Sequence, residues 1–404
     1  MKRIVLLFLL AACGDDADEP VDMTPMDSGV RPRLDARMPE LDTSTPIVED
    51  ASVDSGEPLP SYAECRGYVQ SLHAANVSGR SFSSAVALNQ IYVAYAIATC
   101  GGSASAHATQ GLALVSTPTA GAPGEPMPFL NTSTCVRTSL PTLQTVRGAL
   151  NVFYASNQDG SPQIYLHDDA GTQSLGSGLA LDMAVDRTQL YYARMNAIYA
   201  QQAGGAPQLL LASNEGYALE RIAASELGST ATMFAWTSSA ESAQGAFLRV
   251  LDPGSATPSA AQAVGKIGPQ SGLALASQSK RGAVVWADDQ GSMWLRTVEP
   301  NGSLGAPVRL TSANQFVTDI SVARYGIGYT IAFRATPTVS GQTVIRLLMV
   351  DDLGNTAKPR VISEARSDGH GVEVRVANDG RIVVVWADPG DGDTLIRVAR
   401  LECI

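Results

Sequence analysis

Short apolar strands that end in an aromatic residue recur along the chain from about residue 80 onward. Their small, β-branched and aromatic residues are typical of buried strands. Seven copies are present, with their aromatic residues on average about 48 positions apart. The copies are Ile91–Tyr95, Asn151–Tyr154, Leu190–Tyr192, Thr232–Trp236, Ala283–Trp286, Thr330–Phe333 and Ile382–Trp386.

Further strands surround each copy. A strand of small and apolar residues comes before it, and a polar turn leads into a third strand of alternating pattern, as in Ser292–Arg296, Val344–Leu348 and Thr394–Val398. Gly and Asp mark the turns, for example in Asp288–Gly291 and Asp352–Gly354. No segment of useful length has the periodicity of a helix.

Seven units of this length, with up to four strands each, are typical of a β-propeller, in which each unit forms one sheet, or blade. The sequence therefore predicts an all-β fold, a seven-bladed β-propeller over residues 61–404. The seven aromatic residues occupy one position in the blade. We expect them to belong to the core, each packed against the neighbouring blade.

The last unit ends at Leu401 and leaves no residues for a fourth strand. Residues 66–72 precede the first unit and have no blade of their own, so we expect them to complete the last blade, antiparallel to 394–401. Four of the five cysteines follow residue 60, namely Cys65, Cys100, Cys135 and Cys403, and four cysteines allow three pairings. This arrangement favours Cys65–Cys403, which would lock the ring, and Cys100–Cys135 within the first unit.

The first thirteen residues contain the parts of an export signal in order. Lys2 and Arg3 are followed by the apolar run Ile4–Leu10, which is too short to span a bilayer, and then by Leu10-Ala11-Ala12-Cys13. This order resembles the lipobox of bacterial lipoproteins. The resemblance implies a signal peptide over 1–12, acylation of Cys13 and attachment to a membrane. Gly14 after the cysteine favours the outer membrane or cell surface of the envelope over the inner membrane.

Residues 14–60 carry most of the charge of the chain. They contain thirteen acidic residues, three arginines, seven prolines and no aromatic residue. Such a segment cannot bury enough apolar surface to offset its ordering entropy, so we expect a disordered, acidic tether between Cys13 and the propeller.

The rest of the chain is nearly neutral, since residues 61–404 carry a formal charge of about −3 out of the total of −11. Nucleic-acid binding needs clustered Lys and Arg, which this region lacks. We therefore expect no nucleic-acid partner, and we expect a monomer. The four histidines, His73, His107, His167 and His370, are not paired at metal-ligand spacing. We found no nucleophile-elbow, phosphate-loop or dinucleotide motif, so the sequence assigns no catalytic residue.

Candidate binding residues come from alignment of the innermost strands, whose starts surround one mouth of the axial channel. The position before the first apolar residue of these strands forms a ring, and Arg375 is expected to line the channel beside it. Three carboxylates and an arginine in this ring would suit a cation, a sugar or a basic peptide. The ring consists of Ser84, Thr142, Asp182, Arg221, Gly272, Asp319 and Glu373.

One turn has a pattern that could bind calcium. Asp388–Asp393 alternates carboxylates as a Ca²⁺ loop does, but it lacks the Gly and the distal Glu of an EF-hand. An ordinary hairpin turn and a Ca²⁺ site are the two alternatives here, and the hairpin is favoured.

The units resemble generic bacterial propeller repeats, and one of them partly matches a known hairpin. Asp289, Gly291 and Trp294 fit the Asp-box of sialidase-like propellers, whereas Ala287 and Met293 depart from it. We therefore expect a propeller that acts as a binding or scaffolding module for a protein or glycan partner. The alternative is a sialidase-like hydrolase or lyase that works at the channel mouth with paired carboxylates.

Overall fold

The computed structural model describes residues 65–403 apart from several short stretches. The stretches left out are 73–81, 88, 100–107, 119–123, 138–140, 147–148, 178–182, 187–188, 195, 203–204, 229–230, 253–254, 256, 269–271, 278–280, 313–314, 339–340, 352, 365–370 and 390–393. The described residues belong to one compact unit, Glu57–Ile404. The signal peptide, Cys13 and the acidic tether that the sequence predicts lie outside them.

The described chain forms 28 strands in seven four-stranded antiparallel sheets. The first four sheets contain β2 (Phe82–Ala87), β3 (Gln90–Thr99), β4 (Ala108–Pro118) and β5 (Met127–Arg137); β6 (Thr142–Val146), β7 (Ala149–Ser156), β8 (Gln163–Asp168) and β9 (Gly171–Ser177); β10 (Met183–Asp186), β11 (Gln189–Arg194), β12 (Ala197–Gln202) and β13 (Gln208–Leu211); and β14 (Leu219–Leu227), β15 (Ala231–Ser238), β16 (Gly245–Leu251) and β17 (Gln262–Gly265).

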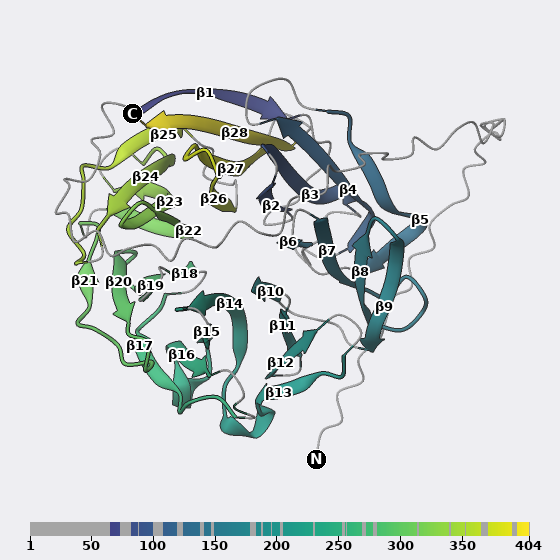
Figure 1. The fold of residues 1–404 in the computed structure, drawn as a ribbon, viewed down its shortest axis with the longest axis horizontal. Coiled ribbons are helices and arrows are strands. Elements are labelled where there is room, and N and C mark those ends of the chain that lie inside the picture. The colour runs from purple at the N-terminus through teal and green to yellow at the C-terminus, as the bar shows by residue number, and fades with distance from the viewer. Residues whose placement is uncertain are drawn as a thin grey trace, which may run out of the picture. The chain divides into compact units, whose positions relative to one another are not determined.

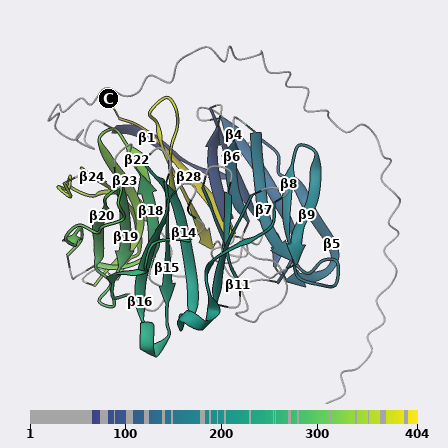
Figure 2. The same ribbon diagram turned by 60° about the horizontal axis from the view of Figure 1, so that its bottom comes forward.

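The last three sheets follow in the same way around the ring. They contain β18 (Leu273–Ser277), β19 (Gly282–Ala287), β20 (Met293–Val298) and β21 (Val308–Arg309); β22 (Gln315–Tyr325), β23 (Gly328–Pro337), β24 (Val344–Val350) and β25 (Arg360–Glu364); and β26 (Val372–Val376), β27 (Ile382–Pro389), β28 (Thr394–Cys403) and β1 (Cys65–Leu72). Figure 1 shows the first strand of each sheet toward the centre, and Figure 2 shows the sheets packed face to face. The prediction of an all-β, seven-bladed propeller is confirmed.

The seventh sheet joins the two ends of the described chain. Its outermost strand is β1, which pairs antiparallel with β28 so that Cys65 lies opposite Cys403 and Leu72 opposite Ile396 (Figure 1). Cys403 is disulfide-bonded. Because β1 belongs to the same sheet as the last three strands of the chain, pairing between residues far apart in sequence closes the ring.

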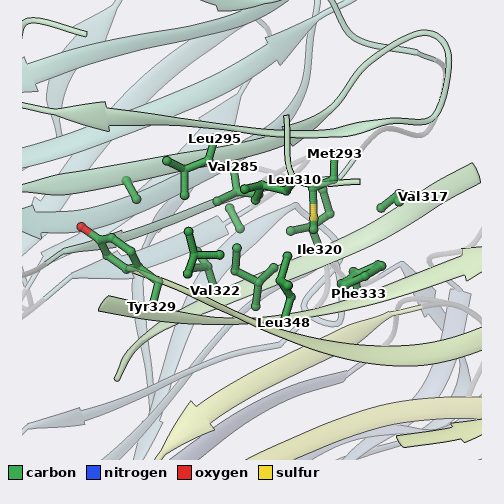
Figure 3. Packing of buried hydrophobic residues seen from close by; sticks show 14 of the residues in the cluster. Val285, Met293, Leu295, Leu310, Val317, Ile320, Val322, Tyr329, Phe333 and Leu348 are labelled. Atoms are coloured by element: carbon green, nitrogen blue, oxygen red, sulfur yellow. The ribbon is translucent and has the colours of Figure 1, made fainter. Parts of the chain in front are cut away.

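The core lies between neighbouring sheets. Between the fifth and sixth sheets, Val285 and Met293 pack with Ile320 and Phe333 (Figure 3). Each of the seven repeated aromatic residues belongs to a cluster shared with the preceding sheet and is at most 3% exposed, which confirms their prediction as core. Burial of side chains this large supplies much of the apolar stabilisation between sheets.

Helical structure is minor in the part of the chain that the structure describes. It consists of two three-residue 3-10 helices, Ser213–Glu215 and Glu241–Ala243. No helix among these residues is long and apolar enough to cross a membrane.

Candidate functional site

The innermost strands enclose a cavity of about 290 Å³ at the centre of the ring. All seven of them, β2, β6, β10, β14, β18, β22 and β26, contribute to its lining. Four charged side chains line it, Arg221, Asp319, Glu373 and Arg375. A ring held together by apolar contacts between its sheets does not need charges at its centre, so we take this cavity as the candidate site.

Two β-bulges set the positions of Arg221 and Asp319. On β14 the register shifts between Leu219 and Arg221, and on β22 it shifts between Val317 and Asp319. A bulge inserts one unpaired residue and redirects the side chains that follow it. The two charged residues thus occupy equivalent places in the fourth and sixth sheets, each directly after a bulge.

A glycine in the sheet between them leaves space for the pair. Gly272 immediately precedes β18, and a Cβ atom at this position would lie 2.8 Å from both the backbone nitrogen and the Cγ1 of Ile320. The fifth sheet therefore places no side chain at this point of the ring. Arg221 approaches from the fourth sheet until its Nη2 lies 4.0 Å from Oδ1 of Asp319 in the sixth.

Asp319 is almost fully buried and has a second cationic neighbour, Arg334. The two residues lie opposite each other on β22 and β23, with Arg334 Nε 3.8 Å from Asp319 Oδ2. The same oxygen accepts a hydrogen bond of 3.3 Å from the backbone nitrogen of Gly371 in the next sheet. These neighbours fix the position of the carboxylate at the cavity wall.

Arg334 extends the charge network into the seventh sheet. Its side chain is 2% exposed, and its Nη2 donates to the carbonyl oxygen of Ala387 at 2.9 Å and lies 4.0 Å from Oδ1 of Asp388. Asp388 in turn accepts from Trp386 Nε1 at 3.2 Å and pairs with Arg397 Nε at 3.0 Å. A buried arginine thus links a cavity residue to the interior of the next sheet.

Glu373 and Arg375 form a separate, self-contained pair where the seventh sheet meets the first. One oxygen of Glu373, Oε2, accepts from the Ser84 nitrogen at 2.6 Å, the Ser84 Oγ at 2.5 Å and Arg375 Nη2 at 2.9 Å. Arg375 also donates through Nε to the Ser84 carbonyl and through Nη1 to the Val374 carbonyl, each at 2.9 Å. All three guanidinium nitrogens of Arg375 are therefore engaged within the protein.

Serine hydroxyls in the cavity lining join neighbouring sheets. Ser83 Oγ accepts the backbone N–H of Leu143 at 3.2 Å, and Ser321 Oγ accepts that of Val374 at 3.0 Å. A hydroxyl that accepts through its oxygen keeps its own proton as a donor. The cavity lining therefore carries O–H donors in addition to the guanidinium groups.

The structure places the predicted channel residues as follows. Arg221, Asp319, Glu373, Arg375 and Thr142 line the cavity. Ser84 contacts Glu373 at its edge, and Gly272 contributes through its lack of a side chain. Asp182 lies outside the described residues, as does Cys100 of the predicted Cys100–Cys135 pair.

Sequence reasoning missed Arg334, Ser83 and Ser321. For Arg334 a signal was present, because this residue follows the apolar run Thr330–Phe333 without a break in a strand that is buried from Gly328 to Ala335. A charge inside such a strand indicates a buried partner. The two serines carried no comparable signal, since serine is common in strands of small residues.

The acidic turn Asp388–Asp393 is only partly described. Asp388 lies at the end of β27 with its carboxylate engaged by Trp386 and Arg397, and residues 390–393 lie outside the description. Among the described residues, no group of three or more His, Cys, Asp or Glu side chains could hold a metal ion.

The partial Asp-box match is corrected in its details. The carboxylate that organises the turn belongs to Asp288 and not to Asp289, which is exposed. Asp288 accepts hydrogen bonds from the backbone nitrogens of Gln290 and Ser292, at 2.9 and 2.8 Å, and from Trp294 Nε1 at 2.7 Å. The motif pattern aligns with Asp289, whereas the carboxylate that makes the hydrogen bonds of the turn belongs to the preceding residue, Asp288.

Comparison with known proteins identifies the fold of the chain but not its function. No family model and no curated protein matches the chain. Among solved structures it is similar to the BP39L lectin from Burkholderia pseudomallei, with 14% identity and a TM-score of 0.57, over 81% of this chain and 99% of the lectin.

Two further similarities concern proteins of other kinds. The NanB sialidase from Streptococcus pneumoniae, as its K499G mutant, matches with 10% identity and a TM-score of 0.50, over 81% of this chain and 68% of the sialidase. The WD40 repeats of RRP9 match with 11% identity and a TM-score of 0.50, over 85% and 99% of the two chains. At these identities the similarities show that the chain has a propeller fold and nothing more specific.

Proposed function

We propose that the propeller is a binding module that takes a protein or glycan partner at its central cavity. The observation that carries this proposal is the charged lining of that cavity, built from inner strands of separate sheets. Asp319 is only 3% exposed, and removal of a charge from water is costly unless other groups compensate it. A ring that only needed stability would be better served by apolar side chains at this place.

The arrangement of the two described cavity carboxylates favours binding over glycan hydrolysis. A glycosidase needs one carboxyl group that can donate a proton to the leaving oxygen and a second one that attacks or activates water. Glu373 is fixed by Ser84 and Arg375, and Asp319 lies between Arg221 and Arg334. Both carboxylates are therefore held in place by groups of the protein, an arrangement that suits the orientation of a ligand.

Binding can be tested with the full chain in detergent and two matched variants. The cavity variant Arg221→Gln/Glu373→Gln removes one charge of each sign from the lining. The control variant Arg281→Gln alters an arginine that is 41% exposed and pairs with Glu299. We expect a partner captured from the cell envelope, or a glycan bound on an array, to be lost with the cavity variant and kept with the control. Equal capture by both variants, with unchanged thermal unfolding, would show that the cavity is not the binding site.

We further propose that the chain is an exported lipoprotein of the cell envelope, held at the outer membrane or cell surface by acylated Cys13. The acidic segment 14–60 would then be the tether between anchor and propeller. The order of charged, apolar and small residues before Cys13 supports this proposal.

The anchor can be tested with Cys13→Ser in the full chain. Wild-type protein should incorporate a palmitate analogue and sediment with membranes, whereas the variant should lose the label and appear in the soluble fraction. Ser28→Ala, in the acidic segment, is the control and should behave as wild type. Continued labelling of Cys13→Ser would refute the assignment of Cys13 as the acylated residue.

A further inference from the structure

Among the described residues, one guanidinium nitrogen in the cavity lining, Nη2 of Arg221, is buried without a hydrogen-bond acceptor. Glu373 and Arg375 satisfy each other together with Ser84 and the Val374 carbonyl. Arg221 has no comparable partner, because its Nη2 is buried and finds no hydrogen-bond acceptor among the described residues. Its nearest carboxylate oxygen, in Asp319, lies at 4.0 Å, beyond hydrogen-bonding distance.

Asp319 cannot fully compensate Arg221, because Arg334 shares its charge. Among the described residues of this network, two carboxylates, those of Asp319 and Asp388, lie beside three guanidinium groups, those of Arg221, Arg334 and Arg397, which leaves an excess of positive charge. A buried donor without an acceptor costs free energy that a suitable ligand atom recovers on binding. The local charge therefore favours a ligand that brings a negative oxygen to Arg221.

The rest of the lining has the character that a sugar requires. The hydroxyl oxygens of Ser83 and Ser321 each accept a backbone N–H through a lone pair. Their own O–H protons therefore remain available as donors. Between these polar groups lie small apolar residues such as Ala223 and Ala274, against which the C–H face of a ring can pack. A volume of about 290 Å³ lies at the lower end of the range of small-molecule sites.

We propose that Arg221 is the anchor for a carboxylate, and that the ligand is a glycan with an acidic sugar unit. This inference rests on the proposed binding function and specifies its ligand class. Arg221 would hold the carboxylate through two N–H donors, as guanidinium groups commonly do, while the serine hydroxyls contact the sugar. The hydroxyl oxygen of a neutral sugar could accept from Arg221 but would not offset its charge, and a basic ligand would be repelled by it.

The test compares acidic glycans with the same glycans after chemical reduction of their carboxyl groups, which changes only the charged group. The full chain in detergent is applied to both sets as wild type, Arg221→Gln, Arg221→Lys and the control Arg281→Gln. We expect wild type and control to bind at least one acidic glycan and to lose about tenfold or more in affinity on its reduction. Arg221→Gln should bind both forms with the same weak affinity, and Arg221→Lys should fall between the two, because it keeps the charge but loses the planar fork.

The outcomes separate this inference from the proposed function. Because Nη2 of Arg221 makes no hydrogen bond within the described protein and lies 4.0 Å from Asp319, Arg221→Gln should fold and should lower the unfolding temperature only slightly. Glycan binding that is insensitive to carboxyl reduction or to Arg221→Gln would overturn the inference while the binding function stands. Binding of an acidic peptide, and of no acidic glycan, through Arg221 would overturn the sugar assignment. Absence of any partner that depends on the cavity would remove the proposed function itself.

Discussion

At the scale of single residues, Arg334 shows how a buried charge connects two sheets. Its guanidinium lies close to Asp319 in its own sheet and to Asp388 in the next. A buried ion pair contributes little compared with an apolar replacement of the whole group, but removal of one partner leaves the other charge buried without compensation. The position of Asp319 at the cavity therefore depends on Arg334, which does not itself line the cavity.

We expect Arg334→Met to lower the free energy of unfolding by about 3 kcal/mol, because two buried carboxylates each lose one of their cationic neighbours. Urea unfolding of the full chain measures the effect. The control Arg281→Met, in an exposed pair, should cost about 1 kcal/mol or less. The double variant Arg334→Met/Asp319→Asn should cost less than the sum of its single changes, since the two residues interact. Additive effects would contradict the proposed coupling between them.

Buried tyrosines make the stability of the fold depend on pH in the alkaline range. Burial raises the pKa of Tyr95 and of Tyr154 from 10.0 to about 12. Because the folded chain holds these phenols neutral more strongly than the unfolded chain does, their contribution to stability is complete below pH 10 and is lost as the pH rises from 10 to 12.

We expect the temperature of unfolding to fall steadily between pH 10 and 12, and Tyr95→Phe to reduce that dependence. Absorbance at the tyrosinate band should show one fewer late-ionising phenol in the variant than in wild type. The unfolded chain in denaturant serves as the reference, with ionisation near pH 10. An unchanged alkaline titration in Tyr95→Phe would show that this phenol does not ionise late.

At the scale of the element, short aspartate turns connect the strands of a sheet. In the turn between β19 and β20, Asp288 accepts from two backbone nitrogens and from Trp294. Gly291 in the same turn has a φ of +72°, a conformation that favours glycine. One carboxylate thus satisfies the backbone of the turn and also fixes the indole ring on the following strand.

The neighbouring aspartates provide their own control. We expect Asp288→Ala to lower the free energy of unfolding by about 2 kcal/mol, because charge-assisted hydrogen bonds to backbone N–H groups are lost. Asp289→Ala, at an exposed position, should change it by less than about 0.5 kcal/mol. Chemical unfolding of the two variants decides the matter, and an equal loss in both would argue against Asp288 as the residue that organises the turn.

At the scale of the whole molecule, the ring closes through the pairing of its first and last described strands. The eight residues of β1 all have partners in β28. The opposed positions of Cys65 and Cys403 and the disulfide at Cys403 favour a bridge between these two cysteines. Such a bridge would join positions at opposite ends of the domain and restrict the unfolded chain strongly.

We expect Cys65→Ser to lower the free energy of unfolding by about 5 kcal/mol, the value that loop-closure entropy gives for a loop of this length. Reduction of the wild-type protein should have a similar effect, and reduction of the variant should add little to it. Peptide mapping without reductant should recover Cys65 and Cys403 in one linked peptide. A linked peptide that joins Cys403 to another cysteine would contradict the pairing.

The candidate site could be predicted in part because the repeats are regular. Residues at the same aligned position of seven similar repeats lie at the same height around the axis of the ring. Alignment of the inner strands was therefore enough to select Arg221, Asp319 and Glu373. It could not show which charges pair. Those pairings depend on a missing side chain at Gly272 and on Arg334, which lies on a second strand.

The sequence by itself determined the periodic features of this protein. The spacing of apolar strands and aromatic residues set the number of sheets and the residues of the core, because burial of one side chain per repeat is a local requirement that repeats seven times. Tertiary structure alone decided that Glu373 is satisfied by Ser84 and Arg375, while Nη2 of Arg221 has no hydrogen-bond acceptor among the described residues. Such pairings depend on distances of a few ångströms between different sheets, which bulges and side-chain packing set and strand periodicity does not.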